Sequence, residues 1–205
     1  MTFAELIAEV QARGFDDLDD ATGEARIKRW LNDAYREITD AYPWPFLEAN
    51  KEGTAPMTFT DLAHIHSLTD KTNGILLAPM DRRSVVALDP KLSETGTASC
   101  WYMEGDQVLK VYPADTSSTF LARYIKRPAA LAESTDEPLI PTAYQGIIVD
   151  GAVVRALKNR NNYEAAQFVR EEWQRGLNQM VIALLKKNYD QPMTTQRTGL
   201  AADYL

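Results

Sequence analysis

The chain has 205 residues, 45% of them hydrophobic and 25% charged, a composition typical of a globular protein with one main core. Its 29 acidic and 22 basic residues give a net charge of -7, which argues against a protein that grips nucleic acid by its phosphates. We expect no secretory signal and no membrane span, and the single cysteine excludes an intramolecular disulfide and favours a reducing compartment.

Two amphipathic helices are predicted at the start of the chain. Apolar residues in segment 3–10 recur at i, i+3, i+4 and i+7, the spacing of one helix face, and Gly14 follows as a stop signal. The same spacing extends over residues 27–38, and Pro43 ends that helix. The acidic residues 16–20 between them suit the positive end of the second helix dipole.

Residues 44–125 have a different pattern, with short apolar stretches separated by turn residues, which predicts antiparallel strands. The clearest hairpin pairs residues 99–103 with residues 107–112. A further strand (120–125) and one or two helical turns (81–88) complete this region.

After a loop over residues 133–141 the pattern is helical again. Residues 144–157 are apolar nearly all round, so this helix should be buried on several sides. Three small residues within it would allow a neighbouring helix to approach closely: Gly146, Gly151 and Ala152.

The last predicted helix has Asn161 as its N-cap, with Glu164 completing a box-like pair, and its apolar stripe continues to Leu184. Residues 189–205 have neither helical nor strand periodicity. The predicted fold is therefore α+β. It has a four-helix bundle-like core (1–43 and 138–188), an inserted antiparallel β-rich subdomain (44–137) and an extended C-terminal tail (189–205).

His64 and His66 are the first candidates for chemistry. On a strand, residues two apart project to the same side, as two metal ligands must. Asp61 and Asp70 are the nearest further candidates, but neither spacing is diagnostic of a metal site. A polar strand face is the ordinary interpretation, and a small metal-dependent enzyme is the alternative.

Other reactive residue types also have ordinary explanations. Cys100 lies beside Trp101 in a predicted strand, where a buried thiol is the usual outcome. The carboxylates Glu133, Asp136 and Glu137 lie in a proline-flanked loop, which favours solvation over acid–base catalysis. There is no Gly-rich phosphate loop and no nucleophile elbow. We therefore predict no catalytic, metal or cofactor site.

Two further features concern packing. Asp150 is set among apolar residues, and we predict a salt bridge to Arg155 or to a basic residue on the last helix, with an interfacial role as the alternative. Trp44, Pro45 and Phe46 lie where the second helix gives way to the insertion. We predict that they attach the β-rich insertion to the helices, and direct contact with another subunit is the alternative.

The order of these segments resembles the head–tail adaptor, or head-completion, proteins of tailed bacteriophages over nearly the full length. The resemblance rests on the combination of five stretches, none of which has a catalytic meaning. They are WLNDAYREI (30–38), PWPFLE (43–48), YIKRPAAL (124–131), DEPLIPTAY (136–144) and IVDGA (148–152).

This resemblance implies a ring of about twelve copies at the virion neck, assembled in the host cytoplasm. The ring would lie beneath the portal and above a tail or nozzle protein, and DNA would pass through its lumen without sequence-specific binding. It implies no cofactor and no membrane. A tail-tube or tail-completion protein is the alternative. Residues of the C-terminal tail would contact the portal or a neighbouring subunit: Tyr189, Pro192, Met193, Arg197, Leu200, Tyr204 and Leu205.

Overall fold

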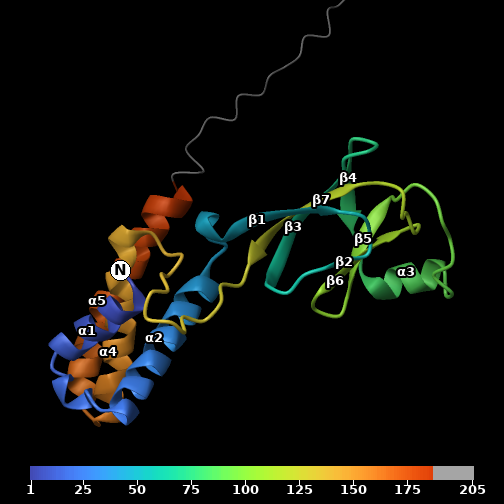
Figure 1. Cartoon of the computed structure of the whole chain (residues 1–205). Coiled ribbons are helices and arrows are strands. Elements are labelled where there is room, and N and C mark those ends of the chain that lie inside the picture. Colours follow the sequence, from blue (N-terminus) through green and yellow to red (C-terminus); the bar gives the residue numbers. More distant parts are fainter. Residues whose placement is uncertain (187–205) are drawn as a thin grey trace, which may run out of the picture.

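The computed structural model describes residues 1–186 of the chain, and it shows helices at one end of an elongated molecule and strands at the other (Figure 1). The α+β class predicted from the sequence is confirmed. Each end has its own hydrophobic cluster. The subdomain boundaries given above stay a prediction.

The helical end contains four long helices that share one hydrophobic cluster. Side chains cap the N-termini of the first, second and last of these helices; Thr2 and Glu5, for example, form a capping box on the first helix. Both predicted N-terminal helices are confirmed, whereas the bundle geometry stays a prediction. The bounds are α1 Phe3–Ala12, α2 Ala21–Ala41, α4 Gly146–Asn159 and α5 Tyr163–Val181, with the short segments η1 Asp16–Leu18, η2 Pro45–Leu47, η3 Thr142–Tyr144 and the π-helical η4 Ile182–Lys186.

Helix α4 packs against α1, α2 and α5, so its predicted burial on several sides is confirmed. A Cβ on Gly151 would lie 2.8 Å from the Cβ of Ala34, which confirms the predicted close approach at that position. Ala152 is fully buried. The prediction is wrong for Gly146, because within residues 1–186 no atom of another helix lies within 4 Å of the position its Cβ would take.

The predicted N-cap of the last helix is wrong by one residue. Asn162 caps α5, and its Oδ1 accepts a hydrogen bond from the Ala165 N–H at 3.3 Å. Asn161 instead has a φ of 56°, in the left-handed region that asparagine tolerates. Its N–H binds the Lys158 carbonyl, and the Asn162 N–H binds the Leu157 carbonyl. Asn161 therefore terminates α4 in a Schellman motif.

The strand end is a seven-stranded sheet in the order β1-β7-β3-β4-β5-β6-β2, curled around its own hydrophobic cluster. Lys51 Nζ donates to the Thr58 carbonyl, which brings β1 and β2 at the two ends of this order together. The predicted hairpin is confirmed as β5 and β6. The strands are β1 Glu48–Gly53, β2 Met57–Thr58, β3 Leu62–Asp70, β4 Ile75–Pro79, β5 Cys100–Glu104, β6 Val108–Tyr112 and β7 Phe120–Lys126.

One pairing departs from the antiparallel prediction. Strands β4 and β5 are parallel, with Ala78 opposite Cys100 and Pro79 opposite Trp101. A parallel pair needs a crossover connection, and helix α3 (Arg82–Leu88) lies within that connection. None of the helices in residues 1–186 is both long and apolar enough to cross a bilayer.

Candidate interaction surfaces

The two histidines predicted as possible metal ligands lie on β3, in a stretch where the pairing with β7 is irregular. Both line a groove between β3 and β4, together with Trp101. Within residues 1–186, no group of three or more His, Cys, Asp or Glu side chains is arranged to hold a metal ion. The metal-dependent alternative therefore has no structural support from this part of the chain.

Cys100 is 3% exposed, and burial raises the pKa of its thiol above the ordinary value. A raised pKa lowers the thiolate fraction, so the sulfur is a poor nucleophile. The Asp136 carboxylate accepts hydrogen bonds from the main-chain N–H groups of Ala132 and Glu133, and these hold its pKa below the ordinary value. Its role is to organise the loop that precedes α4.

The predicted partner of Asp150 is wrong. Asp150 pairs with Arg13, at the end of α1, and not with Arg155 or a residue of α5. Residues five apart lie on different sides of a helix, so Asp150 and Arg155 face different neighbours. Arg155 contacts α2, where it pairs with Glu37. Asp150 and Arg155 thus connect α4 to two different helices.

The aromatic cluster after α2 is centred on Trp44, which is fully buried in the helical hydrophobic cluster. Its Nε1–H donates to the Ile38 carbonyl at 2.7 Å, and its ring stacks on Phe46 with a centroid distance of 5.7 Å. Pro45 begins the short segment η2 that leads into β1. The Trp44 side chain therefore packs against residues of its own chain. Subunit contacts by this cluster stay a prediction.

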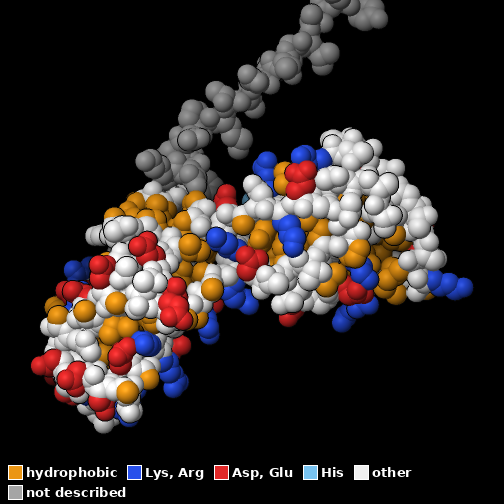
Figure 2. Space-filling model, in the orientation of Figure 1, with side chains coloured by type: hydrophobic (Ala, Val, Ile, Leu, Met, Phe, Trp, Pro, Cys, Tyr) orange, Lys and Arg blue, Asp and Glu red, His pale blue; other side chains and the backbone are white. Residues whose placement is uncertain are grey.

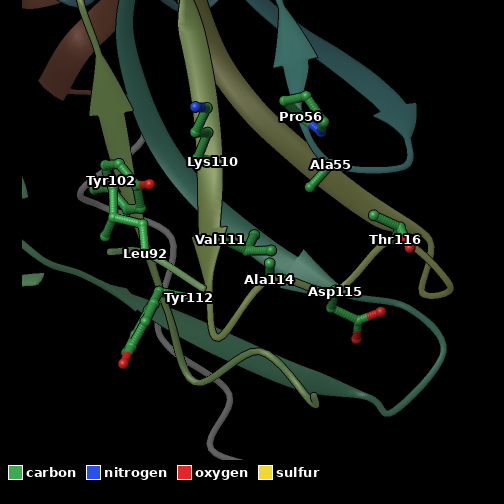
Figure 3. A pocket seen from close by; sticks show the side chains of 10 residues that line it. All are labelled: Ala55, Pro56, Leu92, Tyr102, Lys110, Val111, Tyr112, Ala114, Asp115 and Thr116. Carbon is green, nitrogen blue, oxygen red and sulfur yellow. The ribbon is translucent and has the colours of Figure 1, made fainter. Parts of the chain in front are cut away.

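A pocket of about 260 Å³, which sequence reasoning missed, lies beside β5 and β6 (Figure 3). It is lined by Tyr102, Lys110 and Tyr112 from these strands and by Ala55 and Pro56 from the turn before β2 (Figure 3). The acidic residue that lines it, Asp115, is already bound by main-chain and side-chain donors of Ser117 and by the Ser118 N–H. The Ser118 side chain, followed by the Ser118 main chain and by Ser117, lowers the pKa of Asp115 to about 2 through hydrogen bonds.

Hydrophobic side chains also lie on the outer surface of both ends of the molecule (Figure 2). On the helical end, Tyr163 and Phe168 of α5 are 64% and 62% exposed. On the strand end, Leu76 of β4 and Leu88 of α3 are 68% and 67% exposed. Such residues are candidates for contacts with other protein chains. The predicted contact residues of the tail, from Tyr189 to Leu205, lie outside the described residues.

The exposed apolar side chains on the two ends give the chain surfaces with which it can bind other proteins. The comparison with protein families agrees with such a binding role. The profile of the SU10 adaptor protein family matches residues 1–198, so the chain belongs to this family of phage head–tail adaptors. No curated protein matches the sequence.

Proposed function

We propose that the chain forms a ring beneath the portal of a tailed phage, joins the capsid to the tail at the virion neck and surrounds the DNA exit channel. The observation that carries the proposal is the family match, which spans residues 1–198 of the 205 in the chain. It agrees with the resemblance that the segment order alone had indicated.

The physical properties of the chain support this function. A closed ring needs two different surfaces on each protomer, and the helical and strand ends differ in both fold and exposed side chains. A net charge of -7 per copy would repel DNA phosphates, so a lumen built from such copies would let the duplex slide. In the tail, Tyr189, Pro192, Met193, Arg197, Leu200, Tyr204 and Leu205 are the proposed contacts with the portal or a neighbouring copy.

The test is a native mass measurement of the purified chain with and without its portal protein. We expect a discrete complex of one portal with a ring of about twelve copies. The portal must be present, because a ring can need a template to close. The absence of any complex across a range of ionic strengths would contradict the proposal.

Deletion of residues 189–205 distinguishes the adaptor from a tail-tube or tail-completion protein. In an adaptor, the deletion should abolish or strongly weaken portal binding, because the tail supplies proposed contacts. The full-length chain is the control, and the shortened chain should unfold at the same denaturant concentration. Full portal binding by a folded, shortened chain would favour the tail-side alternative.

A further inference from the structure

The sheet is split between β3 and β4. The two strands pair only where Leu68, Thr69 and Asp70 meet the first three residues of β4. β4 then leaves β3 and pairs with β5. Residues 62–67 of β3 therefore pair with β7 on one side and, among residues 1–186, have an open edge on the other. That edge borders a groove of about 400 Å³.

The groove carries no permanently charged side chain, although 25% of the residues in the chain are charged. An uncharged groove beside an open strand edge favours an extended segment, because main-chain groups then pair with the edge and apolar side chains fill the walls. The groove is lined by His64, Ile65, His66, Ser67, Leu76, Leu77, Ala78, Pro79 and Trp101.

Trp101 supplies a second, independent observation. Its side chain lines the groove and is 8% exposed, and its indole Nε1–H has no hydrogen-bond acceptor among the described residues. A buried donor without an acceptor costs free energy. An added strand would bring main-chain carbonyl oxygens, the kind of acceptor that this donor lacks, to this part of the sheet.

We propose that the open edge of β3 receives residues 193–200 of a second copy of the chain as an additional strand. This inference rests on the proposed ring. A groove on one copy that holds a segment of the next forms the head-to-tail contact that closes a ring. Each copy would give one segment and receive one.

The charge and the strand propensity of the tail sequence are the reasons for placing residues 193–200 in the groove. Between residues 191 and 202 the only charged side chain is that of Arg197, which matches the uncharged groove. Residues 193–200 contain no proline and include three β-branched threonines, which favour a strand. The six residues from 187 to 192, which connect η4 to this segment, span roughly 20 Å when fully extended.

The first experiment is cross-linking between copies in the full-length chain assembled with its portal. One tagged copy carries Ser67→Cys in the groove, and a second, differently tagged copy carries Thr195→Cys. We expect a disulfide between the two tags on mild oxidation. The matched control replaces the groove cysteine with Asn50→Cys, an exposed position on β1 at the other edge of the sheet. Wild-type chain controls for Cys100, which is buried.

The second experiment places a charge in the groove. Leu76→Glu should lower the cross-link yield at least about tenfold, because a carboxylate would have to be desolvated when the strand binds. Leu88→Glu is the matched control, since Leu88 is 67% exposed against 68% for Leu76 and does not line the groove. It should leave the yield unchanged.

The outcomes separate this inference from the proposed function. A portal-bound ring whose groove and tail cysteines cross-link no better than the Asn50 control overturns the inference and leaves the adaptor function standing. A single chain that carries both Ser67→Cys and Thr195→Cys and cross-links only within itself overturns it as well, because the tail would then fill its own groove. A chain that stays monomeric with the portal overturns both.

Discussion

Asn32 of α2 forms two hydrogen bonds with the main chain of Leu131, a residue 99 positions later in the sequence. Asn32 Nδ2 donates to the Leu131 carbonyl at 2.9 Å, and Asn32 Oδ1 accepts from the Leu131 N–H at 2.8 Å. The side-chain amide thus pairs with Leu131 as a neighbouring strand would. It fixes the segment that returns from the sheet to α4 against the helical end.

Replacement of Asn32 by alanine should lower the free energy of unfolding by about 1–3 kcal/mol, because the Leu131 main-chain groups lose their partners while partly buried. Chemical denaturation measures this change. Asn50→Ala, at an exposed position on β1, should change it by less than about 0.5 kcal/mol. Equal effects at the two positions would show that the Asn32 hydrogen bonds contribute nothing.

The Arg13–Asp150 ion pair should contribute little by itself. The two side chains are 38% and 24% exposed, and pairs at such positions contribute at most about 1 kcal/mol. A double-mutant cycle with Arg13→Gln and Asp150→Asn measures the coupling energy, which should fall further at high salt. A coupling above about 2 kcal/mol that salt does not change would contradict this expectation.

The sequence predicts those elements whose signals are local. Helical spacing in residues 3–10 and 27–38 identifies α1 and α2, and the turn around Gly105 identifies the hairpin of β5 and β6. These patterns depend on neighbours within a few residues. Cap signals are equally local, but the predicted cap Asn161 is followed directly by a second asparagine, Asn162, which is the actual cap. Only the backbone shows which of them takes the left-handed conformation.

The sequence could not predict the contacts that join distant segments. Asp150 finds its partner, Arg13, 137 residues away, so an expectation restricted to Arg155 and the last helix missed it. The groove beside β3 exists because β4 leaves β3 after three paired residues, and no local pattern records where a strand changes partner. The stretch at residues 30–38, on which the family resemblance partly rests, does contain two residues that make such long-range contacts. Its Asn32 and Tyr35 bind the main chain of Leu131 and Leu139.

The hydroxyl of Tyr112 donates to a carboxylate oxygen of Glu94 at 2.5 Å. This hydrogen bond, burial and the negative charges of Glu94 and Asp89 raise the pKa of Tyr112 from 10.0 to about 12. Because the folded-state pKa is the higher one, the stabilisation is complete below pH 10.0 and is lost as the pH rises towards about 12.

Glu94→Gln tests whether the Glu94 carboxylate raises the pKa of Tyr112. The substitution removes the charge and keeps an acceptor, so the pKa of Tyr112 should fall towards 10.0 in an ultraviolet absorbance titration. The loss of stability between pH 10.0 and about 12 should become smaller in the variant. Tyr112→Phe identifies which phenol gives the late transition. An unchanged titration in the glutamine variant would assign the shift to burial.

Gly151 and Gly146 both lie in α4, but only Gly151 lies at a helix contact. Alanine is the better helix former by up to about 1 kcal/mol, so propensity alone would stabilise either substitution. At Gly151 the new Cβ would lie 2.8 Å from Ala34 Cβ and 3.1 Å from Trp173 Nε1. Ala34 cannot rotate its methyl group away, and therefore α2 and α4 would have to separate.

Gly151→Ala should accordingly lower the free energy of unfolding by about 1–2 kcal/mol, since the overpacking cost exceeds the gain in propensity. Gly146→Ala is the matched control and should be neutral or stabilising, because in the described part of the chain no atom of another helix lies within 4 Å of its Cβ position. The cost of Gly151→Ala should be smaller in an Ala34→Gly background, where part of the clash is gone. An undiminished cost there would place the strain at Trp173 and not between the two helices.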